Sequence, residues 1–250
     1  MPPENTSADD RLGFLDGVLL SRQLPLSEQV YTLVRKAIVM GNLPPGAPIN
    51  EPEIASRLGI SRTPVREAVK KVSDEGLVEV FAQHGTFVSG IRRAQVEEAY
   101  IIRIALEGES VERAAATISQ RQLQDIEDIH QAHETAVRRA RYDEAIARDD
   151  DLHRAIAEVN DLNMLWKVVD ITKAQMDRCR LQSLPDPGAG LETVAQHRAI
   201  IDALAAGNPE MARQAMLLHL STSLRNTLRY LDRTTACLLY TSDAADDLTR

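Results

Sequence analysis

The sequence has little of several residue types on which whole classes of protein depend. Two cysteines among 250 residues are too few for a disulfide framework or a zinc site built from thiolates, so a reducing cytoplasm is the expected location. Aromatic residues make up only 4% of the chain, which disfavours the stacking platforms that bind single-stranded nucleic acid. No apolar run approaches the roughly 18 residues that a membrane span needs, and no segment has the pattern of a signal peptide. We therefore expect a globular cytoplasmic protein without a membrane partner.

Basic charge is also in deficit, because the formal net charge is −8, and this balance alone argues against nucleic acid. The charge is unevenly distributed, however. The basic residues of the stretch 57–71 are Arg57, Arg62, Arg66, Lys70 and Lys71. Glu67 is the single acidic residue of that stretch. Such a cluster can meet a phosphate backbone at one face of an acidic protein, although most charge clusters are only solvated helix faces.

The first third of the chain has the element order of a winged helix-turn-helix. Hydrophobic periodicity predicts helices over 27–40, 51–58 and 62–74 and strands over 77–81 and 86–89. Gly59 separates the second and third helices by a tight turn. Two helices joined in this way and followed by a β-hairpin are typical of winged DNA-binding domains. We assign residues 26–90 to such a domain, and residues 1–25, which lack a sustained period, to a disordered arm.

The rest of the chain is predicted to be helical. Helices are expected near 94–117, 119–139, 142–159, 161–183, 191–206 and 208–231. Six helices of this length predict an antiparallel bundle over residues 92–233. Residues 234–250 lack an amphipathic pattern and are expected to be a disordered or non-native tail. The predicted fold class is mainly α, with an N-terminal winged helix-turn-helix and a C-terminal all-α antiparallel bundle.

The predicted recognition helix begins with residues that suit DNA. In a helix-turn-helix the second helix enters the major groove with its N-terminal residues nearest the bases. Here those residues are Ser61, Arg62, Thr63 and Arg66. The two arginines are four residues apart on one face, and a guanidinium fork can donate two hydrogen bonds to guanine or to phosphate. The two hydroxyl groups can bind phosphate oxygens near the positive end of the helix dipole.

An aspartate and three histidines of the predicted bundle indicate a metal site. Asp149 and His153 are four residues apart, so one helical face presents a carboxylate and an imidazole together; helical facing favours Asp149 over the two aspartates that follow it. His197 and His219 fall within two other predicted helices. These ligand types suit Zn²⁺, Ni²⁺ or Mn²⁺ better than Ca²⁺. Spacing alone leaves open the alternative that each histidine is a satisfied core residue.

Many spaced residues between positions 27 and 90 match one pattern. They are Leu43-Pro-Pro-Gly46, Ile54-Ala55, Leu58-Gly-Ile-Ser-Arg-Thr-Pro-Val-Arg-Glu-Ala-Val69, Glu75-Gly-Leu-Val78 and Gly85-Thr-Phe-Val88. This segment resembles the GntR family of bacterial transcription regulators. The resemblance implies that Arg62 and Arg66 contact double-stranded operator DNA, and that His84 and Gly85 are wing-tip residues that enter the minor groove.

The segment 92–231 resembles the FCD ligand-binding domain of the FadR subgroup of that family. The matching motifs are Arg103-Ile-Ala-Leu-Glu-Gly108, Asp149-x-x-Leu-His153, Gln196-His-Arg-Ala-Ile200 and Met216-x-x-His219. The metal ligands that the resemblance implies are Asp149, His153, His197 and His219. A small organic acid can bind through its carboxylate at the open positions of such an ion. Arg103 is a candidate second anchor for that carboxylate, or alternatively an ordinary surface pair with Glu107.

These features predict a ligand-responsive transcriptional regulator, with repression as the expected sign. A homodimer presents two winged domains to a two-fold symmetric operator, and the effector changes operator affinity. Two alternatives remain: a metal-dependent hydrolase that uses the His/Asp site, and an architectural DNA-binding protein whose bundle is purely structural. No placed general base, nucleophile motif or phosphate loop accompanies the ligands, so we expect no enzyme.

Overall fold

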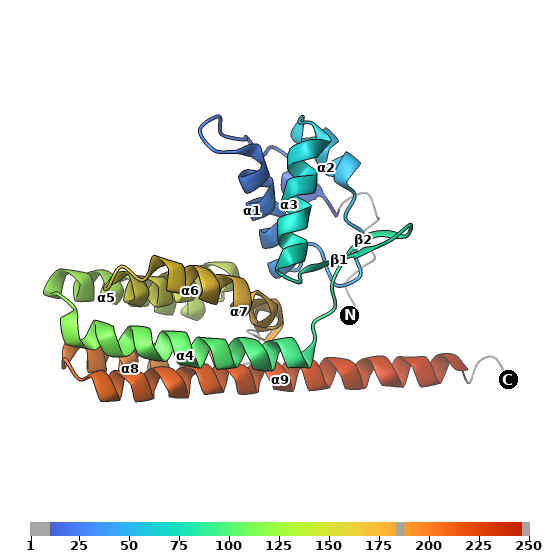
Figure 1. The fold of residues 1–250 in the computed structure, drawn as a ribbon. Helices are drawn as coiled ribbons and strands as arrows, with labels where there is room; N and C mark the ends of the chain where they lie inside the picture. The colour runs from blue at the N-terminus through green and yellow to red at the C-terminus, as the bar shows by residue number, and fades with distance from the viewer. Residues whose placement is uncertain (1–10, 184–187, 247–250) are drawn as a thin grey trace. The chain divides into compact units, whose positions relative to one another are not determined.

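The computed structural model describes residues 11–183 and 188–246, and within them the side chains of residues 11–180 and 188–233. The chain divides into two compact units, Met1–Ile91 and Arg92–Arg250 (Figure 1). None of the described helices has the length and apolar character that a membrane span requires.

The first unit has the element order of a winged helix-turn-helix. In its described part the elements are η2 (Gly13–Leu15), α1 (Leu26–Val39), α2 (Glu51–Leu58), α3 (Arg62–Asp74), β1 (Val78–Phe81) and β2 (Gly85–Val88). The strands pair antiparallel, with Val78 opposite Val88 and Phe81 opposite Gly85. Helix α3 packs against α1, α2 and β1 through an apolar stripe made of Val65, Ala68, Val69 and Val72, all buried.

Local sequence explains where the DNA-reading helix begins. Asn50 caps α2, since its side chain accepts a hydrogen bond of 3.2 Å from the backbone N–H of Glu53. Gly59 then ends α2 at a φ of 66°, a left-handed conformation that glycine adopts without a Cβ clash. The chain therefore reverses direction within a few residues and enters α3 from Ser61.

The arm is predicted to be disordered, but its described part, residues 11–25, contains the short helix η2. Leu12 and Leu15 are three residues apart and both buried, and η2 packs against α2. Asp16 adds an ion pair of 3.2 Å between its Oδ1 and Nη1 of Arg57. A single 3₁₀ turn places both leucines on one side, where they withdraw apolar surface from water. Residues 1–10 lie outside the described part of the chain.

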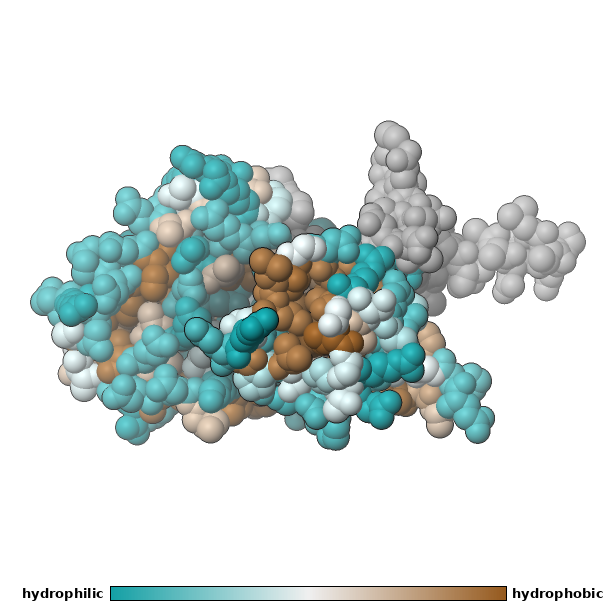
Figure 2. Space-filling view, turned by 90° about the horizontal axis from the view of Figure 1, so that it is seen from above, coloured by the Kyte–Doolittle hydropathy of each residue, from teal (hydrophilic) through white to brown (hydrophobic). Residues whose placement is uncertain are grey.

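The second unit is a helical bundle. Its helices are α4 (Arg93–Thr117), α5 (Gln120–Arg138), α6 (Tyr142–Glu158), α7 (Asn163–Ser183), α8 (Ala189–Ala205) and α9 (Pro209–Asp246). The long helix α9 runs beside α4 and also packs against α7 and α8 (Figure 1), while α5 packs between α6 and α8. The core includes Val111, Ile126, Leu152, Ile156, Ile200, Leu204 and Met216. The molecular face drawn in Figure 2 is largely hydrophilic, with apolar residues gathered in patches.

The predicted end of the last helix is wrong. The helical backbone of α9 continues to Asp246, through most of the segment expected to be a disordered tail, 234–250. No proline or glycine follows Pro209, so no residue that breaks helices interrupts the pattern. Residues 247–250 lie outside the described part of the chain.

Candidate nucleic-acid interface and metal centre

The N-terminal turn of α3 is exposed. Ser61, Arg62, Thr63 and Arg66 all have exposed side chains. Ser61 is the N-cap of α3, but its hydroxyl makes no hydrogen bond to the helix end, so it remains available to a phosphate oxygen. The Arg66 side chain is 76% exposed, and its Nε lies 3.7 Å from Oε2 of Glu51. A surface ion pair at that distance contributes little, so an approaching phosphate or base can replace it.

The wing tip is a tight hairpin held by its backbone. The N–H of His84 donates to the carbonyl of Phe81 over 3.1 Å. Gln83 and Gly85 have φ angles of 65° and 112°, and His84 between them is exposed. The rings of Phe81 and Phe87 meet edge to face at 6.0 Å and support the turn from one side. Both residues that the resemblance assigned to the wing, His84 and Gly85, therefore lie at an exposed tip.

In the second unit the four predicted metal ligands come together from three helices. Asp149 and His153 lie on α6, His197 on α8 and His219 on α9. All four are buried, and one ligand atom from each lies within 4.8 Å of the others. Nε2 of His197 is 3.3 Å from Oδ1 of Asp149, and the Nε2 atoms of His153 and His219 are 3.1 Å apart. Of the three adjacent aspartates, Asp149 contributes the ligand atom of this group, while Asp150 pairs with Lys173 and Asp151 with Arg148.

The hydrogen bonding of this cluster is incomplete. Nδ1 of His197 has no hydrogen-bond partner, and its Nε2 meets Asp149 at 3.3 Å without hydrogen-bond geometry, although the residue is 0% exposed. A buried polar atom without a partner costs free energy. A cation between the four side chains supplies the missing partner, so the donor set fits a metal ion.

The protonation states also favour a cation. Burial lowers the pKa of His197 and of His219 well below the ordinary value, and the neighbouring histidines lower both further. Burial opposes ionisation of Asp149, but the Arg180 guanidinium outweighs it and holds the pKa of that carboxyl well below its usual range. At neutral pH these two imidazoles are therefore uncharged, with a lone pair to donate, and the carboxylate is ionised.

A buried carboxylate stands behind one of the ligands. Oε2 of Glu107 lies 2.5 Å from Nδ1 of His153, and its Oε1 accepts a 2.6 Å hydrogen bond from Nε of Arg103. Carboxylates in this position orient a metal-binding imidazole and raise its basicity. The pair of Arg103 and Glu107 is therefore not a surface pair, because both residues are 4% exposed.

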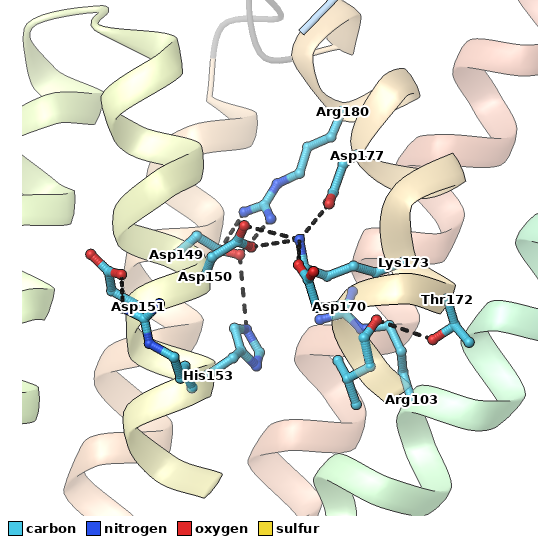
Figure 3. A network of polar contacts seen from close by, with 12 residues as sticks. Arg103, Asp149, Asp150, Asp151, His153, Asp170, Thr172, Lys173, Asp177 and Arg180 are labelled. Carbon is cyan, nitrogen blue, oxygen red and sulfur yellow. Dashed lines mark hydrogen bonds and ion pairs between the residues drawn. The ribbon is translucent and has the colours of Figure 1, made fainter. Parts of the chain in front are cut away.

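Arg180 is a site residue that the sequence did not reveal. Its guanidinium nitrogens contact both carboxylate oxygens of Asp149 (Figure 3). Beside it, the ammonium group of Lys173 contacts Asp150 over 2.9 Å and also Asp177. The pKa of Asp150 is raised to about 6, mainly by burial. The negative charges of Asp177 and Asp149 also raise it, whereas the positive charge of Lys173 lowers it.

A pocket opens beside the cluster between α7, α8 and α9. Its lining consists of Arg180, Ala189, Thr193, Gln196, His219, Thr222, Ser223, Asn226 and Thr227. His219 belongs to both the cluster and the pocket wall, so a molecule in the pocket reaches the cluster. Hydroxyl, amide and guanidinium groups dominate the wall, which suits a small polar ligand. Arg103 is not among these residues.

The buried histidines predict that acid destabilises the metal-free protein. A histidine whose pKa is lowered by folding binds its proton more readily in the unfolded state, so stability falls as the pH drops below about 6.5. Asp150 works in the opposite direction, because folding raises its pKa. The lowered pKa values of His197 and His219 and of His133, at about 4, outweigh that single group. Urea titrations at a series of pH values between about 7.5 and 5 measure this. The free energy of unfolding is expected to fall by about 1.4 kcal/mol per pH unit for each additional proton that the unfolded state binds. A free energy of unfolding that does not change with pH would contradict the prediction.

A winged helix-turn-helix with exposed arginines, joined to a helical bundle that encloses a buried His/Asp cluster, defines a DNA-binding regulator with a separate helical domain. Comparison with known families agrees: residues 26–88 match the model of bacterial regulatory proteins of the gntR family, and residues 98–222 match that of the FCD domain. The chain belongs to the GntR family of transcriptional regulators.

Relatives and solved structures have the same architecture. The chain is 32% identical to the HTH-type transcriptional repressor RspR of Escherichia coli K12 over 196 residues, 78% of this chain and 86% of that protein. It is also 32% identical to a probable D-xylose utilization operon transcriptional repressor of Paenarthrobacter nicotinovorans, over 81% and 88% of the two chains. The structure of E. coli McbR/YncC superposes with a TM-score of 0.73 at 20% identity, over 84% of this chain and 99% of that one. The last likeness shows the fold alone.

Proposed function

We propose that this protein is a ligand-responsive repressor, in which a small organic acid bound at a metal centre of the bundle changes the affinity for operator DNA. The observation that carries the proposal is the buried cluster of Asp149, His153, His197 and His219 with a polar pocket beside it. Two of the relatives are named as a repressor and a probable repressor, which supports repression as the direction of regulation. A homodimer that presents two α3 helices to a two-fold symmetric operator is the assembly we propose for binding.

The metal we propose is one divalent ion, Zn²⁺, Ni²⁺ or Mn²⁺. Three imidazoles and one carboxylate suit these ions. When bound, the ion supplies a Lewis-acidic centre whose remaining positions accept a carboxylate oxygen. Glu107 would fix the ring of His153, and all four ligands are buried.

Arg180 is the side chain that we propose for the second contact to the effector. It lines the pocket and already contacts both oxygens of a carboxylate, that of Asp149. A guanidinium group has five N–H donors, so Arg180 can contact a ligand carboxylate while it still contacts Asp149. Arg103, predicted for this role from the sequence, remains in its buried pair with Glu107.

Coupling to DNA requires that the effector bind the DNA-bound and DNA-released states with different affinity. A coupling free energy of about 1–3 kcal/mol changes operator affinity roughly 5- to 150-fold. The test is a thermal-shift screen of small organic acids with and without divalent metal, followed by operator titration with each acid that binds. Acids that raise the Tm only in the presence of metal, and that weaken operator binding, support the proposal. If no acid shifts the Tm and no metal binds, the bundle is a structural scaffold.

Arg180→Gln is expected to remove the carboxylate response. The metal-dependent Tm shift produced by an active organic acid falls to under a quarter of the wild-type shift, because the bidentate contact is lost. Arg213→Gln is the matched control, since Arg213 pairs with Glu112 over 3.1 Å and is not part of the pocket lining. A full shift in Arg180→Gln would show that another residue anchors the acid.

A further inference from the structure

Two more buried histidines face the first cluster from α5. His130 and His133 are three residues apart, so they lie on the same face of that helix, and α5 packs against α8. One ligand atom from each lies within 4.8 Å of the others and of one from His197. The ring centroids of His133 and His197 are 5.0 Å apart, and those of His130 and His197 6.4 Å. The three residues are 6%, 2% and 0% exposed.

These three imidazoles lack partners in the same way as the first cluster. Nδ1 of His130, Nδ1 of His133 and both ring nitrogens of His197 are buried with no hydrogen-bond partner. A satisfied core histidine donates or accepts through its ring nitrogens. Three neighbouring imidazoles that leave the same atom unpaired are instead arranged for a shared partner.

Charge does not oppose a cation at this position. Burial lowers the pKa of His133 to about 4 and also lowers that of His130, so both rings are uncharged at neutral pH. Of the groups around His130, Arg198 is cationic, and the acidic Glu127, Glu134 and Asp202 offset it. Asp149 and Arg180 act on His133 in opposite directions.

We propose that His130, His133 and His197 form a second transition-metal site, which shares His197 with the Asp149 centre. Three imidazole ligands without a carboxylate select Zn²⁺, Cu²⁺ or Ni²⁺ over Mn²⁺ or Mg²⁺. His130 and His133 would bind as neutral rings, and His197 would bridge the two ions as an imidazolate, its N–H proton passing to solvent when the second ion binds. Ligand nitrogens on one zinc ion lie at most about 4 Å apart, twice the Zn–N distance, so a small inward movement of the rings completes the site. Nε2 of His197 is the atom that lies near Asp149, which leaves Nδ1 for the second ion. The site goes beyond the sensor function proposed above and does not require it.

Metal stoichiometry tests the proposal. The full-length protein is stripped of metal, equilibrated with Zn²⁺ and measured by elemental analysis for bound zinc per chain. Two ions are expected in the wild type, and one in a variant that combines His130→Asn and His133→Asn. The matched control is His219→Asn, which removes a ligand of the first centre only and is expected to keep the second ion.

The outcomes separate this site from the first one. A wild type with one ion that survives His130→Asn/His133→Asn but is lost in His219→Asn overturns the second site and leaves the first intact. One ion with the reverse sensitivity supports the second site and overturns the first. Two ions that both survive the double variant overturn the present proposal.

A second measurement uses only the wild-type protein, so it does not depend on whether a variant folds. Crystals of the wild-type protein loaded with Zn²⁺ are expected to show an anomalous difference peak between α5 and α8, within bonding distance of His130 and His133. A peak at Asp149 with none at these histidines overturns the proposal.

Discussion

Arg66→Ala is expected to abolish specific operator binding while the fold and the assembly stay intact. The side chain is 76% exposed and has only a 3.7 Å contact with Glu51, so its removal costs the folded state little. A bidentate arginine contact is worth about 1–3 kcal/mol of discrimination. The proposed dimer would lose that contact twice, so affinity for the operator is expected to fall roughly 30-fold to 10⁴-fold, while affinity for unrelated DNA falls much less.

Lys70→Ala is the matched control for this prediction. Lys70 lies on the same helix, carries the same charge, has a side chain that is 75% exposed and pairs with Asp74 over 3.0 Å. Farther from the helix N-terminus, it contacts at most the phosphate backbone, so its loss weakens binding uniformly across sequences. Gel-shift titration at fixed salt, with operator and scrambled duplexes, measures both variants. Equal losses in the two variants would show that α3 does not read bases through Arg66.

The winged domain could be predicted because its signals are local. Gly59, the cap at Asn50 and the apolar stripe of α3 each fix a short segment on its own, and their order along the chain defines the fold. The arm shows the limit of this reasoning: one turn that carries Leu12 and Leu15 has too few residues to produce a period, and it finds a place to pack on the surface of α2.

The grouping of Asp149, His153, His197 and His219 could be predicted because two of them lie on one helical turn and because the resemblance to the FCD domain implies all four. Its supporting residues could not. The spacing of Arg103 and Glu107 indicates an ion pair, but whether that pair is exposed depends on how α4 packs in the bundle. Asp177 lies at helical spacing from Arg180, but the contact that makes Arg180 a site residue runs to Asp149 on another helix. His130 and His133 lie in a polar stretch of α5. Because polar side chains occur on both faces of this helix, the sequence pattern does not show that these two histidines are buried.

His219→Asn is the variant that separates sensing from DNA binding. Structural zinc sites bind with about 10–16 kcal/mol; divided over four ligands this is roughly 3 kcal/mol each, so affinity of the first centre for its ion is expected to fall about 100-fold. His219 also lies in the pocket wall, so at metal concentrations that fill the wild-type centre but not the weakened one, the response to an organic acid is lost with the ion. Operator binding without effector is expected to stay within about 3-fold of wild type, because the substitution lies in the second unit and not on α3.

The neighbouring residue on α9 provides the control, because Leu218 is 60% exposed and Leu218→Asn introduces the same side chain without touching the cluster. Metal affinity by competition titration, and operator affinity with and without the acid, distinguish three cases. A His219→Asn protein that keeps wild-type metal affinity would place the ion elsewhere. One that loses the ion but is still released from DNA by the acid would make the metal structural. Only the joint loss of the ion and of the acid response, with basal DNA binding retained, fits a sensor whose coupling passes through this centre. Arg66→Ala is expected to give the opposite result, in which operator binding is lost and the metal centre is kept. The two variants together therefore separate the two functions of the chain.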